Sequence, residues 1–260
     1  MSFQLLIAAV NAQVHTLPEI MGINSDAVLV NQCDTDSEEE FAFEGHHIDI
    51  VNQSNRGVGL SRNTALSKAT ADICLFADED IVYERDYEKT VVEAFLKHPD
   101  ASVITFNVRV DERRRTYFNE DVHKIGRTNY GRYPAYAIAV RREDILKNDI
   151  AFSLLFGGGA KYSNGEDSLF LHDCLEKGLV IYAEVGLLGE ETYRESTWFK
   201  GFNDKFFFDR GVLYHFLYGK AAWLLGARFI LKNRKDMLKE MSFFNAYSLL
   251  CRGIREGRMI

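Results

Sequence analysis

The sequence is poor in cysteine and proline, and both shortages limit what the chain can be. It has four cysteines and three prolines among 260 residues. The cysteines lie far apart and form no C-x-x-C pair, which disfavours a zinc site and a disulfide framework. We therefore expect a reducing, cytoplasmic compartment. Few prolines and a hydrophobic content of 47% argue against disorder, so the chain is expected to fold around one sizeable core.

No stretch of the sequence reads as a signal peptide or a membrane span. The amino terminus has no basic segment before its short apolar run, so residues 3–10 are predicted to form a first strand. Residues 206–231 are aromatic and aliphatic nearly throughout, but Asp209, Arg210 and Arg228 interrupt them. A bilayer tolerates such charges poorly, so core or interfacial helices are predicted there.

Charge is divided unevenly along the chain. The net charge is −7, but residues 198–260 carry 12 Lys and Arg against five Asp and Glu, which leaves −14 for residues 1–197. An acidic main part is a poor nucleic-acid binder, so no such partner is expected. A basic, aromatic-rich extension suits an anionic membrane surface or an anionic acceptor. We therefore predict a main domain at 1–197 and a helical extension at 198–260.

Short apolar strands alternate with helical patterns in the first half of the chain. Residues 73–76 are apolar without alternation, as in a strand covered on both faces, and such strands occur mainly in parallel sheets flanked by helices. Similar strands are predicted at 27–30 and 48–51, and a helix at 60–71. This order predicts an α/β fold with a Rossmann-like, mostly parallel central sheet and helices on both faces.

The remaining segments show weaker patterns. Residues 34–40 are predicted to be a polar connection, and residues 109–132 a mobile surface segment, because neither shows a clear period. Residues 156–165 are expected to form a flexible approach to a helix. The other elements predicted from spacing are helices at 86–97, 166–177 and 233–258 and strands at 101–110 and 134–140.

Three acidic residues, Asp78, Glu79 and Asp80, follow the apolar run at 73–76. Ligands of open α/β sheets bind at the carboxyl ends of strands, and carboxylates one residue apart can hold a hard divalent cation already bound to phosphates. A solvated acidic turn would have the same sequence. Two further acids, Glu166 and Asp167, open a predicted helix, where the helix dipole favours their ionised forms.

In order and spacing, these segments resemble the family 2 glycosyltransferases, enzymes of the GT-A fold that use a nucleotide-diphosphate sugar. Residues 55–63, NRGVGLSRN, are similar to the family's N-x-G-x-x-x-A-R-N stretch. Asp78, Glu79 and Asp80 are similar to its D-x-D, and Glu166 with Asp167 is similar to its E-D pair. Asn11 matches the asparagine that closes the family's first strand motif. The resemblance covers about residues 1–185 and implies a catalytic, nucleotide-sugar-binding GT-A domain at 1–197.

The chain also departs from the family's pattern. Asn31 and Gln32 stand where the family usually has paired aspartates, and Ala8 and Ala9 stand where its first strand usually has a proline. An amide can still bond a uracil or a ribose, so the identity of the base stays open. The Q-x-x-R-W motif of processive synthases is absent, which favours a single transfer over polymer synthesis.

The resemblance implies a set of donor-binding residues and a metal. Asp80 would ligate Mn²⁺ or Mg²⁺, and Asp78 would reach the ribose or share the metal. Arg62 would present a fixed positive fork to the diphosphate, which a lysine could not reproduce; a surface charge is its alternative role. The full donor-binding set is Asn11, Asn31, Gln32, Arg62, Asn63, Asp78 and Glu79.

The resemblance also implies the chemistry. Asp167, beside Glu166, would act as general base toward the acceptor hydroxyl, and one displacement would invert the anomeric configuration. His215 would complete the metal shell, as a later histidine does in some GT-A enzymes, or it packs as an ordinary interfacial histidine. Trp198 and Phe199 would stack on an acceptor sugar or pack in a core.

The expected function is an inverting glycosyltransferase that moves a sugar from a nucleotide-diphosphate sugar, with a UDP-sugar as the expected donor. The acceptor would be a saccharide or a lipid-linked saccharide of bacterial polysaccharide or glycoconjugate synthesis, handled in the cytoplasm at the inner face of the membrane. A noncatalytic GT-A scaffold is one alternative. A nucleotidyltransferase is another, but it would need a glycine-rich phosphate loop after the first strand, where NAQVHTLPE has none. The oligomeric state is not predicted.

Overall fold

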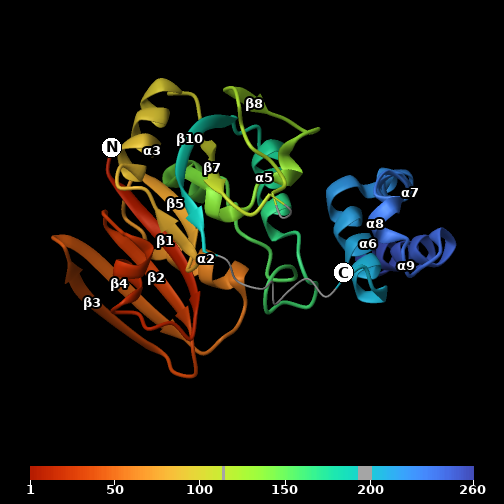
Figure 1. Ribbon diagram of the computed structural model, residues 1–260, viewed down its shortest axis with the longest axis horizontal. Coiled ribbons are helices and arrows are strands. Elements are labelled where there is room, and N and C mark those ends of the chain that lie inside the picture. Colours follow the sequence, from red (N-terminus) through yellow and green to blue (C-terminus); the bar gives the residue numbers. More distant parts are fainter. Residues whose placement is uncertain (113–114, 193–200) are drawn as a thin grey trace. The chain divides into compact units, whose positions relative to one another are not determined.

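The computed structural model describes residues 1–112, 115–192 and 201–260, and these form two compact units (Figure 1). The first unit consists of the described residues of Met1–Leu154 and Glu166–Arg194, and the second of those of Leu155–Gly165 and Glu195–Ile260. The second unit is therefore built from two separate stretches of the chain. The predicted boundary between residues 197 and 198, with Trp198 and Phe199, lies outside the described residues.

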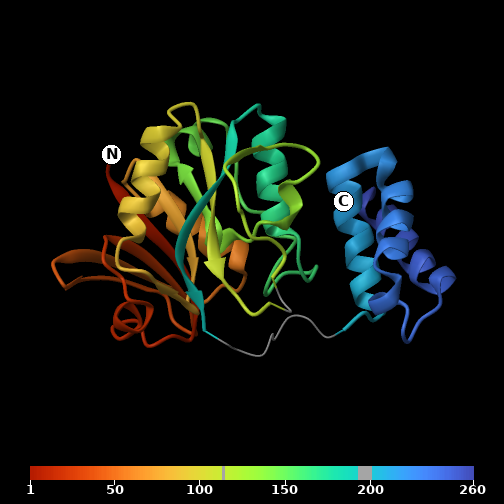
Figure 2. The same cartoon turned by 45° about the horizontal axis from the view of Figure 1, so that its top comes forward.

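A mixed sheet of ten strands forms the centre of the first unit's described part. The strands are β1 Phe3–Val10, β2 Ala27–Gln32, β3 Ser37–Phe43, β4 His46–Gln53, β5 Ile73–Asp78, β6 Ile81–Tyr83, β7 Val103–Arg109, β8 His123–Ile125, β9 Ile138–Arg141 and β10 Ile181–Glu191. Their order is β3-β4-β2-β1-β5-β9-β7-β10-β6, with β8 paired to β10. Neighbours β4, β2, β1 and β5 are parallel, and β7 pairs in parallel with β10 (Figure 2), so six strands share one direction. The predicted, mostly parallel sheet is confirmed.

Helices cover both faces of this sheet, which explains why its central strands are apolar without alternation. The helices of the first unit are α1 Leu17–Met21, α2 Val58–Lys68, α3 Tyr87–Lys97, α4 Arg142–Lys147 and α5 Glu166–Glu176, with short 3₁₀ turns η1 Tyr130–Arg132 and η2 Ala135–Ala137. Successive side chains of a strand point to opposite faces. Leu75 belongs to the core cluster that holds Tyr87 of α3, whereas the Phe76 ring lies 5.7 Å from Phe170 of α5.

The second unit is helical and has its own hydrophobic core. Its helices are α6 Asp204–Tyr218, α7 Ala222–Lys232, α8 Arg234–Met237 and α9 Phe243–Gly257, with the 3₁₀ turn η3 Gly219–Ala221. Helices α6 and α9 approach each other closely. A Cβ atom on Gly253 would overlap the backbone oxygen of Phe208, and a Cβ atom on Gly211 would overlap the backbone oxygen of Leu250. None of the helices in the described part of the chain is both long and apolar enough to cross a membrane.

The segment 155–165 is bonded to these helices. Asp209 of α6 is buried and accepts hydrogen bonds from the backbone N–H and the hydroxyl of Ser163, at 2.9 and 2.6 Å. Lys161 lies 3.0 Å from Glu256 of α9. The segment predicted as a flexible approach is thus held by specific contacts within the second unit.

Several predicted elements were wrong in kind or extent. The supposed connection at 34–40 includes the first four residues of β3, which pairs antiparallel with β4 through an exposed acidic stretch that carries no apolar signal. Residues 134–140 begin with η2 before β9, and residues 109–132 contain β8 and η1. The helix predicted at 233–258 is two helices, α8 and α9. Strand β10 was missed, because charges and glycines interrupt its apolar residues.

Candidate functional site

The carboxyl ends of the parallel strands meet at one edge of the first unit's sheet. Asp78 ends β5 and pairs in register with Ala8 of β1, while Gln32 ends β2 opposite Val10 of β1. Asn11 follows directly and has a positive φ of 50°, a conformation that asparagine tolerates better than most residues. The sequence-predicted strand-end residues therefore come together along this edge, as the parallel pairing requires.

Arg62 of α2 joins the two acidic motifs. Its side chain is only 3% exposed, and one terminal nitrogen lies 2.9 Å from Asp78. The other terminal nitrogen lies 3.0 Å from Asp167 and 3.3 Å from Glu166, at the start of α5. The guanidinium carbon also lies 5.3 Å from the centre of the Phe152 ring. Motifs about 90 residues apart in the chain are thus held within ion-pair distance of one cation.

The charges of this cluster shift the ionisation of its members. Burial alone would lower the pKa of Arg62, but the charges of Asp78, Asp167 and Glu166 outweigh it and raise that pKa. Burial raises the pKa of Asp167 to about 8, and the charge of Glu166 adds to this shift, while Arg62 opposes it. The backbone N–H of Ala135 donates to the Asp167 carboxylate and also lowers its pKa. Asp167 is therefore a much stronger base than an ordinary aspartate.

Tyr136 of η2 belongs to the same site, although the sequence offered no signal for it. Burial raises the pKa of its phenol, and the charges of Glu191, Asp78, Asp167 and Asp80 raise it further. These four carboxylates, from β10, β5, α5 and the turn after β5, therefore act electrostatically on the phenol. Asp78 and Asp80, the sequence-predicted metal ligands, carry the hard oxygen atoms that a divalent cation prefers, and their role as ligands stays a prediction.

The segment at residues 55–63 is fixed against the backbone near Phe152. The Asn63 amide donates to the Phe152 carbonyl at 2.9 Å and accepts from its N–H at 2.8 Å. A Cβ atom on Gly59 would lie 2.6 Å from the Ser153 carbonyl oxygen, so only glycine permits this approach. Asn63 therefore uses its amide to hold α2, and through α2 to hold Arg62, beside the 152–153 segment.

The amides of Asn31 and Gln32 make hydrogen bonds inside the fold. Both residues are buried. The Asn31 carbonyl oxygen accepts from the Ala12 N–H at 3.0 Å, and its amide nitrogen donates to Asn52 at 2.9 Å. The Gln32 side-chain oxygen accepts from the Gly57 N–H at 2.8 Å. These contacts tie the end of β2 to the chain just after β1, to β4 and to the loop that starts α2.

His215 belongs to α6 of the second unit. Its Nδ1 atom is buried and lacks a hydrogen-bond partner within the described residues, and Gly257 of α9 packs against its ring. These neighbours are those of a packed interfacial histidine. Its role as a metal ligand stays a prediction.

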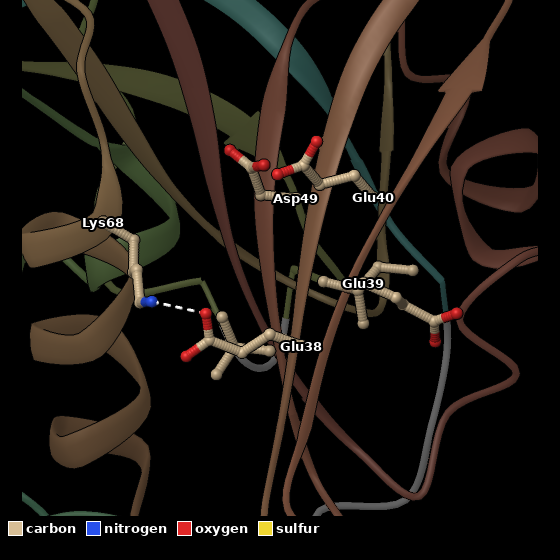
Figure 3. Close-up of a pocket in the computed structure, with 7 residues that line it drawn as sticks. Glu38, Glu39, Glu40, Asp49 and Lys68 are labelled. Atoms are coloured by element: carbon tan, nitrogen blue, oxygen red, sulfur yellow. Dashed lines mark hydrogen bonds and ion pairs between the residues drawn. The ribbon is translucent and has the colours of Figure 1, made fainter.

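A separate acidic hollow lies on the other part of the sheet, at the β3–β4 ribbon (Figure 3). Its volume is about 430 Å³, and it is lined by Glu38, Glu39, Glu40, Asp49, Ile50, Val51 and Lys68. Lys68 is bonded to Glu38 at 2.6 Å. Within the residues that the structure describes, Glu40, His47 and Asp49 are the group whose ligand atoms lie close enough to hold a metal ion, and His47 bonds Asp49 at 2.9 Å. Strands β2 and β1 separate β4 from β5.

Sheet and site together define the GT-A class of α/β proteins. The model of the family described as "Glycosyl transferase family 2" matches residues 6–152, more than half of the chain, and the chain belongs to this family. Membership classes it with the glycosyltransferases. The matched segment ends before Glu166, so the role of the E-D pair depends on its ion pairs with Arg62 and on its place in the chain.

Known proteins similar to this chain agree with that assignment. "Glycosyltransferase GlyA" of Streptococcus pneumoniae serotype 4 (strain ATCC BAA-334 / TIGR4) is 30% identical over 79 residues, which are 29% of this chain and 11% of that protein. The structure of S. aureus TarS 1–349 with UDP-GlcNAc aligns with a TM-score of 0.63 at 16% identity, over 90% of this chain and 73% of that one. Mannosyltransferase PcManGT from Pyrobaculum calidifontis, with GDP-Man and Mn²⁺, aligns with a TM-score of 0.53 at 13% identity, over 98% and 86%. At these identities the structures show the fold alone.

Proposed function

We propose that this protein is an inverting glycosyltransferase that moves a sugar from a nucleotide-diphosphate sugar to an acceptor hydroxyl. The observation that carries the proposal is the contact of Arg62 with Asp78 on one side and with Glu166 and Asp167 on the other. A group that binds the donor and a group that activates the acceptor must act on the same anomeric carbon. An ion-pair cluster that joins the two motifs supports that shared site.

Asp167 would supply the base. It takes the proton from the acceptor hydroxyl while that oxygen attacks the anomeric carbon, and the bond from this carbon to the diphosphate oxygen breaks with its electrons. The nucleoside diphosphate leaves on the opposite face, so one displacement inverts the configuration. A carboxylate whose pKa is raised to about 8 is well matched to proton transfer near neutral pH. Glu166 and Arg62 would hold Asp167 in place.

Asp78 and Asp80 would hold a divalent cation, with Glu79 and Asn11 near the donor at the same strand edge. When bound, such a cation neutralises negative charge on the departing diphosphate. The Mn²⁺ in the similar mannosyltransferase structure supports Mn²⁺ as the first ion to test, with Mg²⁺ as the alternative. Asn31 and Gln32 would shape the nucleotide subsite through the loop that they hold.

The donor and acceptor assignments are also proposals. The similar TarS structure holds UDP-GlcNAc, which supports a UDP-sugar as the first donor to test. We propose the first unit as the catalytic domain and the basic second unit as a contact for the acceptor or a membrane surface. A saccharide or lipid-linked saccharide acceptor of bacterial polysaccharide synthesis, at the inner face of the membrane, would suit this arrangement.

The experiment is nucleotide release from UDP and GDP sugars with Mn²⁺, compared between the wild-type protein and Asp167→Asn. We expect the substitution to lower kcat by about 10²- to 10⁴-fold, because it removes the base. Donor affinity, measured by calorimetry, should stay within a few fold, because asparagine keeps the size of Asp167 and leaves the proposed metal ligands Asp78 and Asp80 unchanged.

Asp173→Asn is the matched control, since it changes an exposed aspartate of the same helix and should keep full activity. Equal activity of Asp167→Asn and wild type would remove Asp167 from the base role. If no common nucleotide sugar is bound or cleaved, the noncatalytic scaffold becomes the better description.

A further inference from the structure

Helix α7 has an outer face that is apolar and cationic. Ala222, Gly226 and Ile230 are buried against the rest of the unit. On the opposite side Leu224 is 74% exposed and Leu231 is 49% exposed, at a spacing of seven residues that places them on one face. Arg228 lies exposed between them. The helix contains no aspartate or glutamate, so this face combines leucines with positive charge that its own helix does not offset.

Trp223 extends this face onto α9. Its ring lies 5.8 Å from the guanidinium carbon of Arg255 and 5.4 Å from that of Arg258. The Tyr247 hydroxyl donates to the Trp223 carbonyl at 3.3 Å, which fixes the two helices together at this point. Trp223, Leu224, Arg228, Leu231, Arg255 and Arg258 therefore form one surface, called here the α7–α9 basic face.

Positive charge dominates around the α7–α9 basic face. Residues 201–260 contain 11 Lys and Arg against five Asp and Glu. The single acid of α9, Glu256, lies 3.0 Å from Lys161, so it does not compensate the exposed Arg255 and Arg258. Exposed cations beside exposed leucines match a surface that is anionic outside and apolar beneath.

We propose that the α7–α9 basic face docks on an anionic lipid bilayer. Arginines near anionic headgroups gain electrostatic attraction, and tryptophan prefers the level of the headgroups. Leu224 and Leu231 reach outward from the same face and would enter the acyl boundary, which gives an interfacial contact rather than a span. This inference rests on the surface contact proposed above for the second unit, assigns it to one face and to lipid, and its test needs no catalysis.

The test is co-sedimentation of the full chain with vesicles. Vesicles of phosphatidylcholine with roughly a third phosphatidylglycerol should bind the protein at about 0.1 M salt and release it at about 0.5 M salt, since screening weakens headgroup attraction. Vesicles of phosphatidylcholine alone should bind it at least about tenfold more weakly.

Two variants assign this binding to the face. Arg228→Gln, Arg255→Gln and Arg258→Gln together should weaken binding to the anionic vesicles by about tenfold or more. Leu224→Ser, which removes apolar contact without changing charge, should weaken it several-fold. The matched control is Arg85→Gln, Arg127→Gln and Lys177→Gln together. It removes the same charge from exposed positions of the first unit and should bind within twofold of wild type.

Three results would overturn the proposal. The first is equal binding of the triple arginine variant and the control, and the second is equal binding of the protein to neutral and anionic vesicles. The third is a concentration-dependent dimer that Leu224→Ser abolishes, in a protein that does not bind vesicles. The last would assign the face to a second copy of the chain. If the triple arginine variant fails to fold, the vesicle binding of Leu224→Ser decides whether the proposal holds, because the Leu224 side chain is already mostly exposed and its replacement should not disturb folding. None of these outcomes bears on donor binding, so failure here leaves the proposed transfer intact.

Discussion

Arg62 shows how one buried side chain can organise a site whose other members lie far apart in the sequence. A buried charge is costly unless it is paired, and Arg62 has three carboxylates within 3.3 Å. The arrangement is stable only if β5, α2 and α5 keep their relative positions. The contacts of Asn63 and Gly59 with the 152–153 segment supply that rigidity. Arg62 therefore holds the three carboxylates together in the fold.

We predict that Arg62→Lys weakens both stability and activity. Lysine keeps the charge but has one nitrogen, so it cannot reach Asp78 and Asp167 from separate terminal atoms as arginine does. We expect the unfolding temperature to fall by about 4 °C or more. The fall should be smaller than if the charge were removed altogether, because removing one partner of a buried pair costs roughly 3–5 kcal/mol of stability. The rate of nucleotide release should fall at least about tenfold, because each ion pair of Arg62 helps to align the carboxylates.

Calorimetric unfolding and steady-state kinetics measure these effects. Arg127→Lys is the control, because Arg127 is paired with Glu176 at 2.8 Å but is 73% exposed, and exposed pairs contribute little. An Arg62→Lys protein as stable and as active as the control would refute the positioning role.

The proposed role of Asp167 as the base predicts a pH dependence of activity. Its pKa is raised to about 8, first by burial and then by the charge of Glu166, and only the ionised form can accept a proton. We predict that kcat/KM falls about tenfold for each pH unit below this pKa and levels off above it. A kcat/KM that does not change between about pH 6 and 9 would contradict Asp167 as the base.

The same pKa shift has a consequence for stability. Since the folded state holds this proton more tightly than the unfolded state, the contribution of Asp167 to stability is fully present below its ordinary pKa of 3.8 and is lost as the pH rises toward about 8. The folded protein thus keeps a carboxyl group whose ionised form lowers its stability. Its retention is expected of a functional group.

At the scale of single residues, the sequence identified the acids but not their environment. Asp78, Asp80, Glu166 and Asp167 were recognised by motif, yet their pairing with one arginine depends on contacts between distant elements. Tyr136 was missed because a tyrosine in a stretch of small residues has no local mark of function. Only the fold brings its ring among Glu191 and the other carboxylates.

At the scale of elements, the crossing of α6 and α9 offers a sharp test. Gly253→Ala would place a Cβ atom against the backbone oxygen of Phe208, which cannot move aside as a side-chain end could. We predict a loss of about 1–3 kcal/mol, although alanine is intrinsically the better helix former by about 1 kcal/mol. Tryptophan fluorescence in a Trp198→Phe background follows the second unit, because the remaining tryptophan, Trp223, lies in α7.

Gly126→Ala is the control for this substitution. A Cβ atom at Gly126 meets no heavy atom within 4 Å, so the variant should unfold within about 1 °C of wild type. A Gly253→Ala protein more stable than wild type would show that α6 and α9 can separate at no cost.

The elements that could be predicted are those whose apolar pattern follows from burial on both faces. Strand β1 was located at its observed bounds, and β5 was found because Ile73 to Phe76 are all buried. Strand β3 was missed because an edge strand with exposed Glu38, Glu39 and Glu40 carries the signal of a loop. Its acids face solvent, so nothing in its own composition requires it to pair.

At the scale of the whole molecule, the uneven charge of the sequence corresponds to two units with different surfaces. The acids of the proposed chemistry belong to the first unit, and the exposed arginines of the α7–α9 basic face belong to the second. The charge asymmetry could be read from the sequence. That residues 155–165 pack with the C-terminal helices could not, because their glycines and serines carry no mark of a partner some 45 residues later.

That interleaving of the two units has a consequence for biosynthesis. Ser163 leaves the ribosome before Asp209, with the whole of α5 and β10 between them. The first unit can therefore close around Glu166 and Asp167 while the loop just upstream still lacks its partners. Until α6 and α9 have been synthesised, that loop leaves Phe156 and Tyr162, both buried in the finished fold, without their helical partners. A nascent chain stalled before α6 would thus be the species most in need of a chaperone.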